Sequence, residues 1–312
     1  MFKTIRDGYG TGLLEAGEAD DRVVVLTADL KDSTRCGAFA DRFPKRFVQC
    51  GIAEQNMASV AAGLSLVGKK PVINSFAVFN PGRNWDQVRA SICYMGADVV
   101  IAGHHSGLSA GEDGATHQAL EDIAITRVLP NLVVLNPMDA EEARFSIRAA
   151  CKYDGPVYLR LSKYAIETVS VERFKITSFE IGVGHVLKKG RDLTLAVSGP
   201  LTQSCLEAAD LVSDECDVEV VSFSSIKPFD RNLLIDSAMK TGTVLTVEDH
   251  QIAGGFGSLV CEVLSEGFPC RVWRHGIHDL FGGSGNIADL MRKYELDVDG
   301  IAKKIRSVLS FL

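Results

Sequence analysis

The chain has 312 residues, of which 33 are lysine or arginine and 40 are aspartate or glutamate, so its formal net charge is −7. This balance excludes a nucleic-acid partner held by a broad positive field. With 46% hydrophobic and 23% charged residues the chain can bury a sizeable core, and its length predicts roughly two domains.

Short apolar runs rich in β-branched residues alternate with longer helix-like stretches in the first half of the chain. This rhythm is typical of parallel strands joined by crossover helices and predicts an α/β fold. The expected strands are 22–28, 71–76, 98–103, 132–135 and 156–161. The expected helices are 54–66, 83–95 and 139–151. We interpret residues 1–165 as a first doubly wound domain.

The sequence of residues 166–190 breaks this rhythm with polar and β-prone residues, and we interpret it as a linker. A second series of alternating elements follows it. Its expected strands are 193–197, 218–223, 244–248 and 271–274. Its expected helices are 202–212, 232–239, 257–265 and 298–309. Residues 191–312 therefore form a second, smaller doubly wound domain of ordinary size.

The cysteines are scattered, and no Cys-x-x-Cys pair suggests a zinc or redox motif. They are Cys36, Cys50, Cys93, Cys151, Cys205, Cys216, Cys261 and Cys270. Buried free thiols in a reducing compartment are the expectation. The N-terminus lacks the apolar core of a signal peptide, and no window approaches the roughly 18 apolar residues of a membrane span. We therefore expect a cytoplasmic protein that spans no membrane.

Proteins of this class place their chemistry in loops at the carboxyl ends of the strands. The loop over residues 103–118, GHHSGLSAGEDGATHQ, holds three histidines, two acids and four glycines. Glycines let the backbone approach a ligand, and His105, Asp113 and His117 can exchange hydrogen bonds with hydroxyl and phosphate oxygens. A glycine-rich turn with solvated polar side chains is the alternative. A metal site is less favoured, because these residues lack a defined ligand spacing.

Glu54 lies in the first turn of a helix that is otherwise almost wholly small and apolar. We expect this helix to be buried on most sides. A surface carboxylate at a helix N-terminus is merely stabilised by the dipole. A buried one either has a partner or holds a proton at neutral pH, which is how general acids are made.

Phe76 and Phe79 lie three residues apart at a strand end, where two rings can wall a pocket for a flat ligand. Ordinary core packing explains such a pair equally well, so the two phenylalanines alone do not predict a site.

Four longer motifs occur in order along the chain: GIAEQNM at 51–57, GEDGATHQ at 111–118, LPNLVVLNPMDAEEA at 129–143 and VEDHQIAGGFGS at 247–258. On these motifs the chain resembles the transketolase family over essentially its whole length. The resemblance implies that residues 1–165 are a thiamine-diphosphate pyrimidine-binding domain and residues 191–312 a transketolase C-terminal domain. It implies a transferase that moves a two-carbon ketol unit from a ketose to an aldose.

By this resemblance Glu54 hydrogen-bonds N1′ of the thiamine diphosphate pyrimidine. A proton shared there favours the imino tautomer of the 4′-amino group, which can then remove the C2 proton of the thiazolium. Phe79, with Phe76 nearby, matches the aromatic residues around that pyrimidine, and Asp29 matches the acid on the thiazolium side. Gly82 stands where typical members carry a tyrosine, so the pocket has a different wall.

The resemblance also implies substrate contacts. His117 would bind the donor's ketol hydroxyls, and Asp113 would read the hydroxyl configuration at C2 of the acceptor. The residues that fall where the family holds a substrate phosphate are His105, Ser33 and Arg6. Lys163 replaces an arginine of that site. Lysine offers a point charge where arginine offers a bidentate fork, so the identity of the substrate's terminal anion stays open.

The family's diphosphate-binding half carries a Gly-Asp-Gly motif and an asparagine about thirty residues later, which hold the bridging Mg²⁺. Nothing in the chain matches this pattern. The resemblance therefore implies the C-terminal subunit of a split, two-gene transketolase, with thiamine diphosphate at the interface and Mg²⁺ on a separate diphosphate-binding subunit. No metal ligand is expected in this chain. The family is built around a twofold, so an α2β2 heterotetramer is expected.

The second domain is expected to serve assembly more than chemistry. His250 and the glycines at 254, 255 and 257 are expected to be structural, because the family's catalytic positions do not include them.

Three alternatives stay open. A 1-deoxyxylulose-5-phosphate synthase shares the GIAEQ and DG-x-THQ signatures but normally holds both cofactor halves in one chain. The β subunit of a 2-oxo acid dehydrogenase E1 has this size and architecture but normally lacks the Asp-Gly-x-Thr-His-Gln arrangement. A non-catalytic scaffold subunit has no need of a buried acid.

Overall fold

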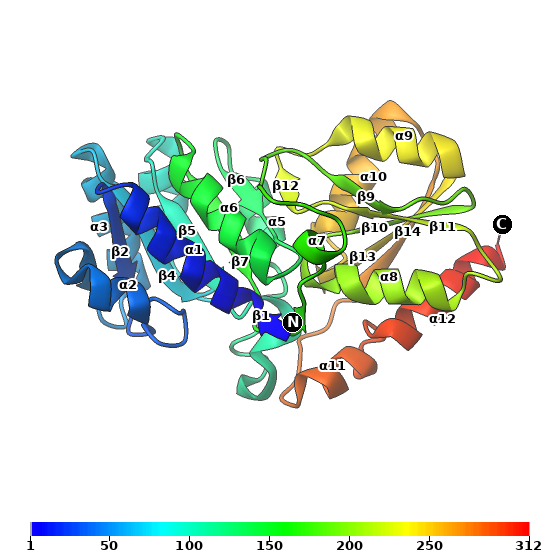
Figure 1. Cartoon of the computed structure of the whole chain (residues 1–312), viewed down its shortest axis with the longest axis horizontal. Helices are drawn as coiled ribbons and strands as arrows, with labels where there is room; N and C mark the ends of the chain where they lie inside the picture. The colour runs from blue at the N-terminus through cyan, green and yellow to red at the C-terminus, as the bar shows by residue number, and fades with distance from the viewer. Residues whose placement is uncertain (1, 312) are drawn as a thin grey trace.

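Runs of buried aliphatic residues form a seven-stranded sheet in the order β12-β6-β7-β5-β4-β2-β3 (Figure 1). The computed structural model describes residues 2–311. The strands of this sheet are β2 (Val23–Thr27), β3 (Phe47–Gln49), β4 (Lys70–Phe76), β5 (Val100–His104), β6 (Val133–Leu135), β7 (Val157–Leu161) and β12 (Ser225–Lys227). All neighbours pair in parallel except β12, which is antiparallel to β6. The predicted α/β class is confirmed.

Helices cover both faces of this first sheet. They are α1 (Ile5–Ala19), α2 (Gly37–Arg42), η1 (Pro44–Arg46), α3 (Glu54–Leu66), α4 (Trp85–Gln87), η2 (Val88–Tyr94), η3 (Gly107–Asp113), α5 (Asp122–Arg127) and α6 (Ala140–Lys152). The helices α1 and α6 pack on one face, whereas α3, η2 and α5 contribute to the core on the other. A short antiparallel pair joins β1 (Phe2–Thr4) to β8 (Ala165–Glu167).

The helix α1 was not expected, because its four glycines disfavour a helix. Its glycines instead allow a close approach to α6. A Cβ at Gly8 would lie 1.7 Å from the Ala140 carbonyl oxygen, and one at Gly12 would lie 2.4 Å from that of Arg144. Helix packing therefore outweighs the low helix propensity of these residues.

The single helix expected over 83–95 was wrong in its start and its type. The side-chain amide of Asn84 donates to the Glu54 carbonyl at 3.2 Å and to Asn80 Oδ1 at 3.0 Å, so the segment before Trp85 forms a turn. The segment η2 then continues α4 as a π-helix.

The second sheet has the order β14-β13-β10-β11-β9. Its strands are β9 (His185–Lys188), β10 (Leu193–Val197), β11 (Val218–Ser222), β13 (Thr243–Gln251) and β14 (Arg271–Ile277). Only β9, which lies within the segment interpreted as a linker, is antiparallel to its neighbour. The helices of this half are α7 (Val169–Glu172), η4 (Gly199–Leu201), α8 (Thr202–Leu211), α9 (Arg231–Thr241), α10 (Phe256–Gly267), α11 (Ile287–Lys293) and α12 (Val298–Leu309). The helices α9 and α10 lie on one face and α8 and α12 on the other (Figure 1).

The two halves share structure. Strand β12 comes from the second half and pairs with β6 of the first, through Ser225 opposite Leu135. One core cluster also joins Leu129 of the first half to Phe223 and Phe256 of the second. The halves therefore pack as one body around their junction.

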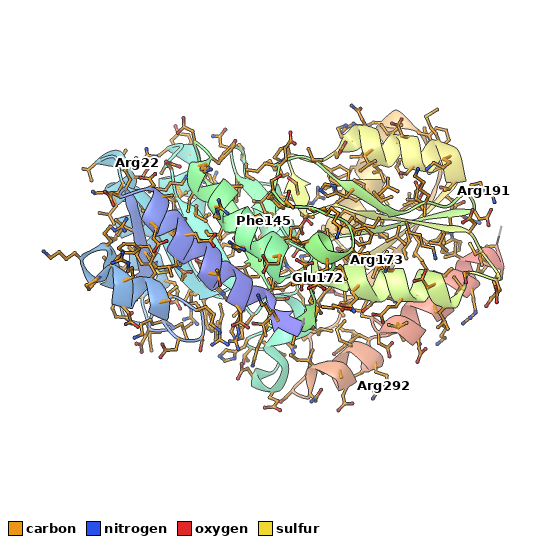
Figure 2. The ribbon with its side chains drawn as sticks, in the orientation of Figure 1. Arg22, Phe145, Glu172, Arg173, Arg191 and Arg292 are labelled. Carbon is orange, nitrogen blue, oxygen red and sulfur yellow. The ribbon has the colours of Figure 1, made fainter. Side chains whose placement is uncertain are left out.

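Charged side chains such as those of Arg22, Arg173 and Arg292 are exposed at the surface (Figure 2). None of the helices in residues 2–311 is long and apolar enough to cross a membrane. All eight cysteines are free.

Glu142 lies buried at the junction of the two halves. Its Oε2 accepts hydrogen bonds from the Met138 N–H at 2.6 Å and the Ser224 hydroxyl at 2.7 Å, whereas Oε1 has no partner among residues 2–311. Burial raises the pKa of this carboxyl from 4.5 to about 7.

The raised pKa predicts a pH-dependent stability. Between about pH 4.5 and pH 7 the folded chain binds a proton at Glu142 that the unfolded chain does not, so this group's contribution falls as pH rises. The expected loss is on the order of 3 kcal/mol over that range. Urea unfolding of the wild type and of Glu142→Gln from pH 4.5 to 8 should show a shallower decline for the variant. Parallel profiles would contradict the assignment, and Glu18→Gln at the exposed surface is the control that should follow the wild type.

Candidate functional site

Glu54 begins α3 and is only 2% exposed. Ser75 at the end of β4 donates its hydroxyl to Oε1 at 3.4 Å, and the Arg83 guanidinium lies 3.4 Å from Oε2. Of the two possibilities for a buried acid, a partner or a held proton, the structure shows a partner. The partner was not predicted, because Arg83 is 29 residues away in the sequence.

The expectation that α3 is buried on most sides was wrong. Its inner face buries Met57, Ala58, Ala61 and Ala62, but its outer face exposes Gln55, Asn56, Ser59, Val60 and Gly63. The small apolar composition therefore does not reflect a helix enclosed by its own chain.

Phe76 and Phe79 form a flat apolar surface beside this carboxylate. Their rings are nearly parallel, with an interplanar angle of 19° and 6.2 Å between the centroids. Arg83 also places its guanidinium carbon 4.3 Å from the centre of the Phe79 ring. The ion pair with Glu54 and the contact with Phe79 thus belong to the same arginine.

Two predicted histidines join the aromatic pair. The His105 ring lies 4.0 Å from Phe76, and the His117 ring meets Phe79 edge-on at 5.5 Å. The loop that carries them begins where β5 ends, and His105 adopts a left-handed backbone with φ of 54°. Folding therefore brings the predicted loop to the predicted aromatic pair.

A third histidine, His104, belongs to a buried network next to His105. Its Nε2 lies 3.3 Å from Asn74 Oδ1, which also accepts a hydrogen bond from the Tyr9 hydroxyl. The Tyr9 and His104 rings meet edge-on at 4.8 Å. This buried network was not predicted, because its members lie on α1, β4 and β5.

Basic side chains surround His105. Burial, together with the positive charges of Arg6, Lys163 and Arg35, lowers the pKa of this histidine to about 3, so it is neutral at pH 7. Arg6 donates to the Ser33 carbonyl at 3.1 Å. His105 Nδ1 and Arg6 Nε are buried and have no hydrogen-bond partner among residues 2–311. Unpaired buried donors and acceptors of this kind are expected at a ligand site.

Asp29 and Asp113 remain at the margins. Asp29 follows β2 with φ of 61°, and its N–H donates to Gln49 Oε1 at 2.8 Å, while Gln49 donates back to Oδ1 at 3.3 Å. Asp113 lies exposed at the end of η3. Both occupy the carboxyl edge of the sheet, which Glu54 and the histidine loop also occupy, but no contact links either side chain to the aromatic pair.

Local packing explains why residue 82 is a glycine. A Cβ at this position would lie 2.1 Å from the Val78 carbonyl oxygen, so the tyrosine of typical family members does not fit here. The neighbouring Arg83 lies over Phe79 instead.

The described residues contain no group of three or more histidine, cysteine, aspartate or glutamate side chains arranged to hold a metal ion.

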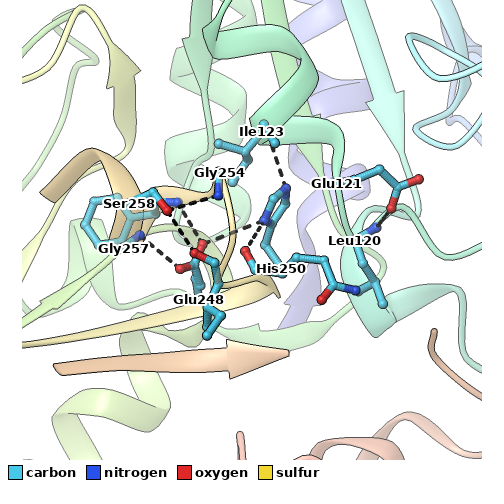
Figure 3. Close-up of polar contacts among 12 residues, drawn as sticks. Leu120, Glu121, Ile123, Glu248, His250, Gly254, Gly257 and Ser258 are labelled. Atoms are coloured by element: carbon cyan, nitrogen blue, oxygen red, sulfur yellow. Dashed lines mark hydrogen bonds and ion pairs between the residues drawn. The ribbon is translucent and has the colours of Figure 1, made fainter. Parts of the chain in front are cut away.

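The motif VEDHQ places acids and a histidine at the junction of the two halves (Figure 3). Glu248 accepts hydrogen bonds from the N–H groups of Phe256 and Gly257, at 2.7 and 2.9 Å, and so holds the start of α10. His250 Nδ1 lies 3.8 Å from Glu248 Oε2, and His250 Nε2 accepts a hydrogen bond from the Ala124 N–H at 3.4 Å. Burial lowers the pKa of His250 to about 4. These contacts join β13 to the start of α10 and to α5.

Known proteins match both halves of the chain. Residues 3–168 match the transketolase pyrimidine-binding domain, and residues 182–301 match the transketolase C-terminal domain. A chain named transketolase C-terminal section from Methanocaldococcus jannaschii is 41% identical, over 98% of this chain and 96% of its own length. The 6-deoxy-6-sulfo-D-fructose transketolase subunit SqwH of Clostridium sp. strain MSTE9 is 36% identical, over 97% of this chain and 94% of its own.

Other relatives match in two different ways. The 1-deoxy-D-xylulose-5-phosphate synthase of Heliobacterium modesticaldum is 38% identical over 96% of this chain but only 46% of its own length. A solved split-gene transketolase, described as an inactive beta4 tetramer, is 43% identical with a TM-score of 0.90 and 98% coverage of both chains. The chain therefore belongs to the transketolase family, and the three proteins above that it matches over nearly their whole length are named as a transketolase C-terminal section, a transketolase subunit and a split-gene transketolase.

Proposed function

We propose that the chain supplies the pyrimidine-binding side of a transketolase, which transfers a two-carbon ketol unit from a ketose to an aldose together with a separate diphosphate-binding subunit. The observation that carries this proposal is the meeting of buried Glu54, two parallel aromatic rings and two histidines at one edge of the first sheet. The only two contacts that the structure shows for this buried carboxylate among residues 2–311 are both 3.4 Å long, whereas Glu142 and Glu248 accept hydrogen bonds of 2.6 and 2.7 Å, and this difference favours an enzyme over a scaffold subunit.

The residues present fit the pyrimidine end of thiamine diphosphate. Both contacts of the Glu54 carboxylate are 3.4 Å long, which leaves it able to make a shorter and stronger bond. Phe76 and Phe79 offer a flat apolar surface to an aromatic ring. Bound thiamine diphosphate supplies a nucleophilic carbon, and the proposed task of Glu54 is to share a proton at N1′ of the pyrimidine. Asp29 is proposed for the thiazolium side.

The substrate residues are proposed at the same edge. His117 is assigned to the ketol hydroxyls of the donor, and Asp113 to the C2 hydroxyl of the acceptor. The terminal anion of the substrate is assigned to Arg6, Lys163, His105 and Ser33, of which the first two carry a positive charge. The buried, unpaired Nδ1 of His105 and Nε of Arg6 support this assignment, since both remain available to a ligand.

Exposed apolar side chains along α3 and the adjacent η2 support a partner subunit. Val60, Leu66 and Tyr94 in these helices, and Val67 and Met95 directly after them, are exposed, and an apolar surface of this kind is typical of protein interfaces. We propose that the diphosphate-binding subunit covers this face, holds Mg²⁺ and forms an α2β2 heterotetramer. The eight free thiols fit the reducing cytoplasm as the proposed location.

Reconstitution tests the proposed function. The chain is mixed with the diphosphate-binding subunit from the same organism, thiamine diphosphate and Mg²⁺, and assayed with a ketose phosphate and an aldose phosphate. We expect ketol transfer only when both chains are present, and light scattering should give the mass of two copies of each. Chelation of Mg²⁺ should abolish the activity, and added Mg²⁺ should restore it.

Two other outcomes would replace this function. Condensation of pyruvate with an aldehyde phosphate, without ketol transfer, would show the 1-deoxyxylulose-5-phosphate synthase reaction, which the 38% identity to such enzymes keeps as the second candidate. Turnover of 2-oxo acids with an artificial electron acceptor would show a dehydrogenase E1 subunit.

A further inference from the structure

An aspartate of the second half, Asp249 on β13, contacts the loop that carries the histidines of the first half. Its side chain is only 3% exposed. The Leu108 N–H donates to its two carboxylate oxygens at 3.0 and 3.3 Å. Leu108 lies between His105 and Asp113, so Asp249 holds the middle of the segment to which substrate binding is assigned.

The loop backbone fits tightly against this carboxylate at Gly107. This glycine has φ of 64°, which side-chain-bearing residues rarely adopt, and a Cβ here would lie 1.9 Å from Asp249 Oδ2. The loop can therefore adopt this path only with a glycine at position 107, facing Asp249.

The same carboxylate also holds the segment that carries Lys163. The Tyr164 hydroxyl donates to Asp249 Oδ2 at 2.7 Å, and the Lys163 N–H donates to the Ser109 hydroxyl of the loop at 2.9 Å. The Arg160 guanidinium donates a hydrogen bond to the main-chain carbonyl of Asp249 at 2.8 Å. Asp249 thus connects two segments that carry proposed substrate-binding residues, the histidine loop and the segment with Lys163.

The second half contacts the loop at two further points. Ser284 donates its hydroxyl to the Glu112 carbonyl at 2.6 Å, and Gln118 donates to the Gly283 carbonyl at 2.9 Å. The loop is therefore braced by the second half along its length.

We propose that Asp249 is a positioning residue for the substrate: it sets the spacing between the histidine loop and Lys163, so the second half serves substrate binding as well as assembly. This proposal rests on the proposed function. It differs from the expectation that the second domain serves assembly more than chemistry. Among residues 2–311, no hydrogen bond or ion pair joins Asp249 to Glu54, and the hydrogen bonds of the Asp249 carboxylate go to Leu108 and Tyr164, so cofactor binding should be independent of it.

The kinetic test uses Asp249→Ala in the reconstituted two-subunit enzyme. We expect a 10- to 100-fold loss of kcat/KM, roughly, carried mainly by a higher KM for the sugar phosphate, because small displacements of binding groups have effects of this size. The dissociation constant of thiamine diphosphate should stay unchanged. Asp249→Asn should restore most of the activity, since its amide can still accept from the Leu108 N–H and pair with the Tyr164 hydroxyl.

Glu248→Ala is the matched control. Glu248 is an equally buried carboxylate on the same strand, but its hydrogen bonds go to the start of α10. We expect this variant to lose stability while the KM for the sugar phosphate stays at the wild-type value. An unchanged KM in Asp249→Ala, or equal KM changes in both variants, would overturn the proposal. If Asp249→Ala does not fold, Tyr164→Phe is measured instead. It removes one hydrogen bond to Asp249 and should raise the KM for the sugar phosphate by a smaller factor.

Hydrogen–deuterium exchange on the chain alone separates this inference from the proposed function, because it needs no activity. Asp249→Ala should speed exchange over residues 107–118, whereas Glu248→Ala should speed it at the start of α10. If the wild-type enzyme transfers no ketol unit, the proposed function fails, and with it the role in substrate binding. Faster exchange over 107–118 would still establish Asp249 as the residue that holds the loop, and unchanged exchange would overturn that as well.

Discussion

Replacing Glu54 by glutamine is expected to remove nearly all ketol transfer from the reconstituted enzyme and to leave subunit assembly intact. Glutamine has the same shape and can keep the hydrogen bond from Ser75, but it cannot share a proton with a ring nitrogen as a carboxyl group does. Removal of such a proton-transfer group costs roughly 10²- to 10⁴-fold in rate. The measurements are kcat in the coupled assay and the mass of the complex by light scattering.

Glu18→Gln makes the same chemical change at an exposed position and should have wild-type activity. Wild-type turnover in Glu54→Gln would contradict the role of Glu54. Loss of the complex in this variant would instead show that the Glu54 pair with Arg83 is needed for assembly.

Replacing Arg160 by methionine is expected to cause the largest loss of stability. The Arg160 guanidinium is 1% exposed and donates to Asp122 Oδ2 at 2.9 Å and to the Asp249 carbonyl at 2.8 Å. The Tyr158 hydroxyl donates to the same Asp122 oxygen at 2.6 Å. Without the cation, Asp122 is left as a buried, unpaired charge, and breaking such a pair typically costs about 3–5 kcal/mol. Urea unfolding followed by circular dichroism measures the change.

The control is Arg191→Met. Arg191 lies at the surface of the second half (Figure 2), and its side chain is 84% exposed although it pairs with Asp217. Exposed pairs contribute little, so the unfolding midpoint should stay near that of the wild type. Equal midpoints for the wild type and Arg160→Met would show that the buried pair does not stabilise the fold.

The elements that could be predicted are those whose pattern depends only on nearby residues. The expected helices 54–66 and 298–309 and the strand 193–197 match the structure residue for residue, because each is a regular apolar pattern with clear ends. The elements that were not predicted depend on a different kind of information. Helix α1 exists because its glycines pack against α6, and β12 exists because β6 offers an edge, so both depend on partners far away in the sequence.

The candidate site likewise divides into residues that local motifs indicate and contacts that only folding creates. The motifs indicated Glu54, Phe79 and His117, and the structure brings them to one edge of the sheet. The contact of Arg83 with Glu54 depends on the turn before α4, and the contact of Asp249 with Leu108 spans 141 residues. No local pattern contains such information, because the first contact arises only when the first half folds and the second only when the two halves pack together.

The pairing of β12 with β6 limits how this protein can be divided. If the chain were cut in the 166–190 segment and the second half removed, β6 would lose one of its two neighbours and become an edge strand with unpaired backbone groups. Such edges invite pairing with other chains and hence aggregation. An engineer who wishes to exchange the second half with that of a relative must therefore choose a donor whose equivalent strand fits this edge.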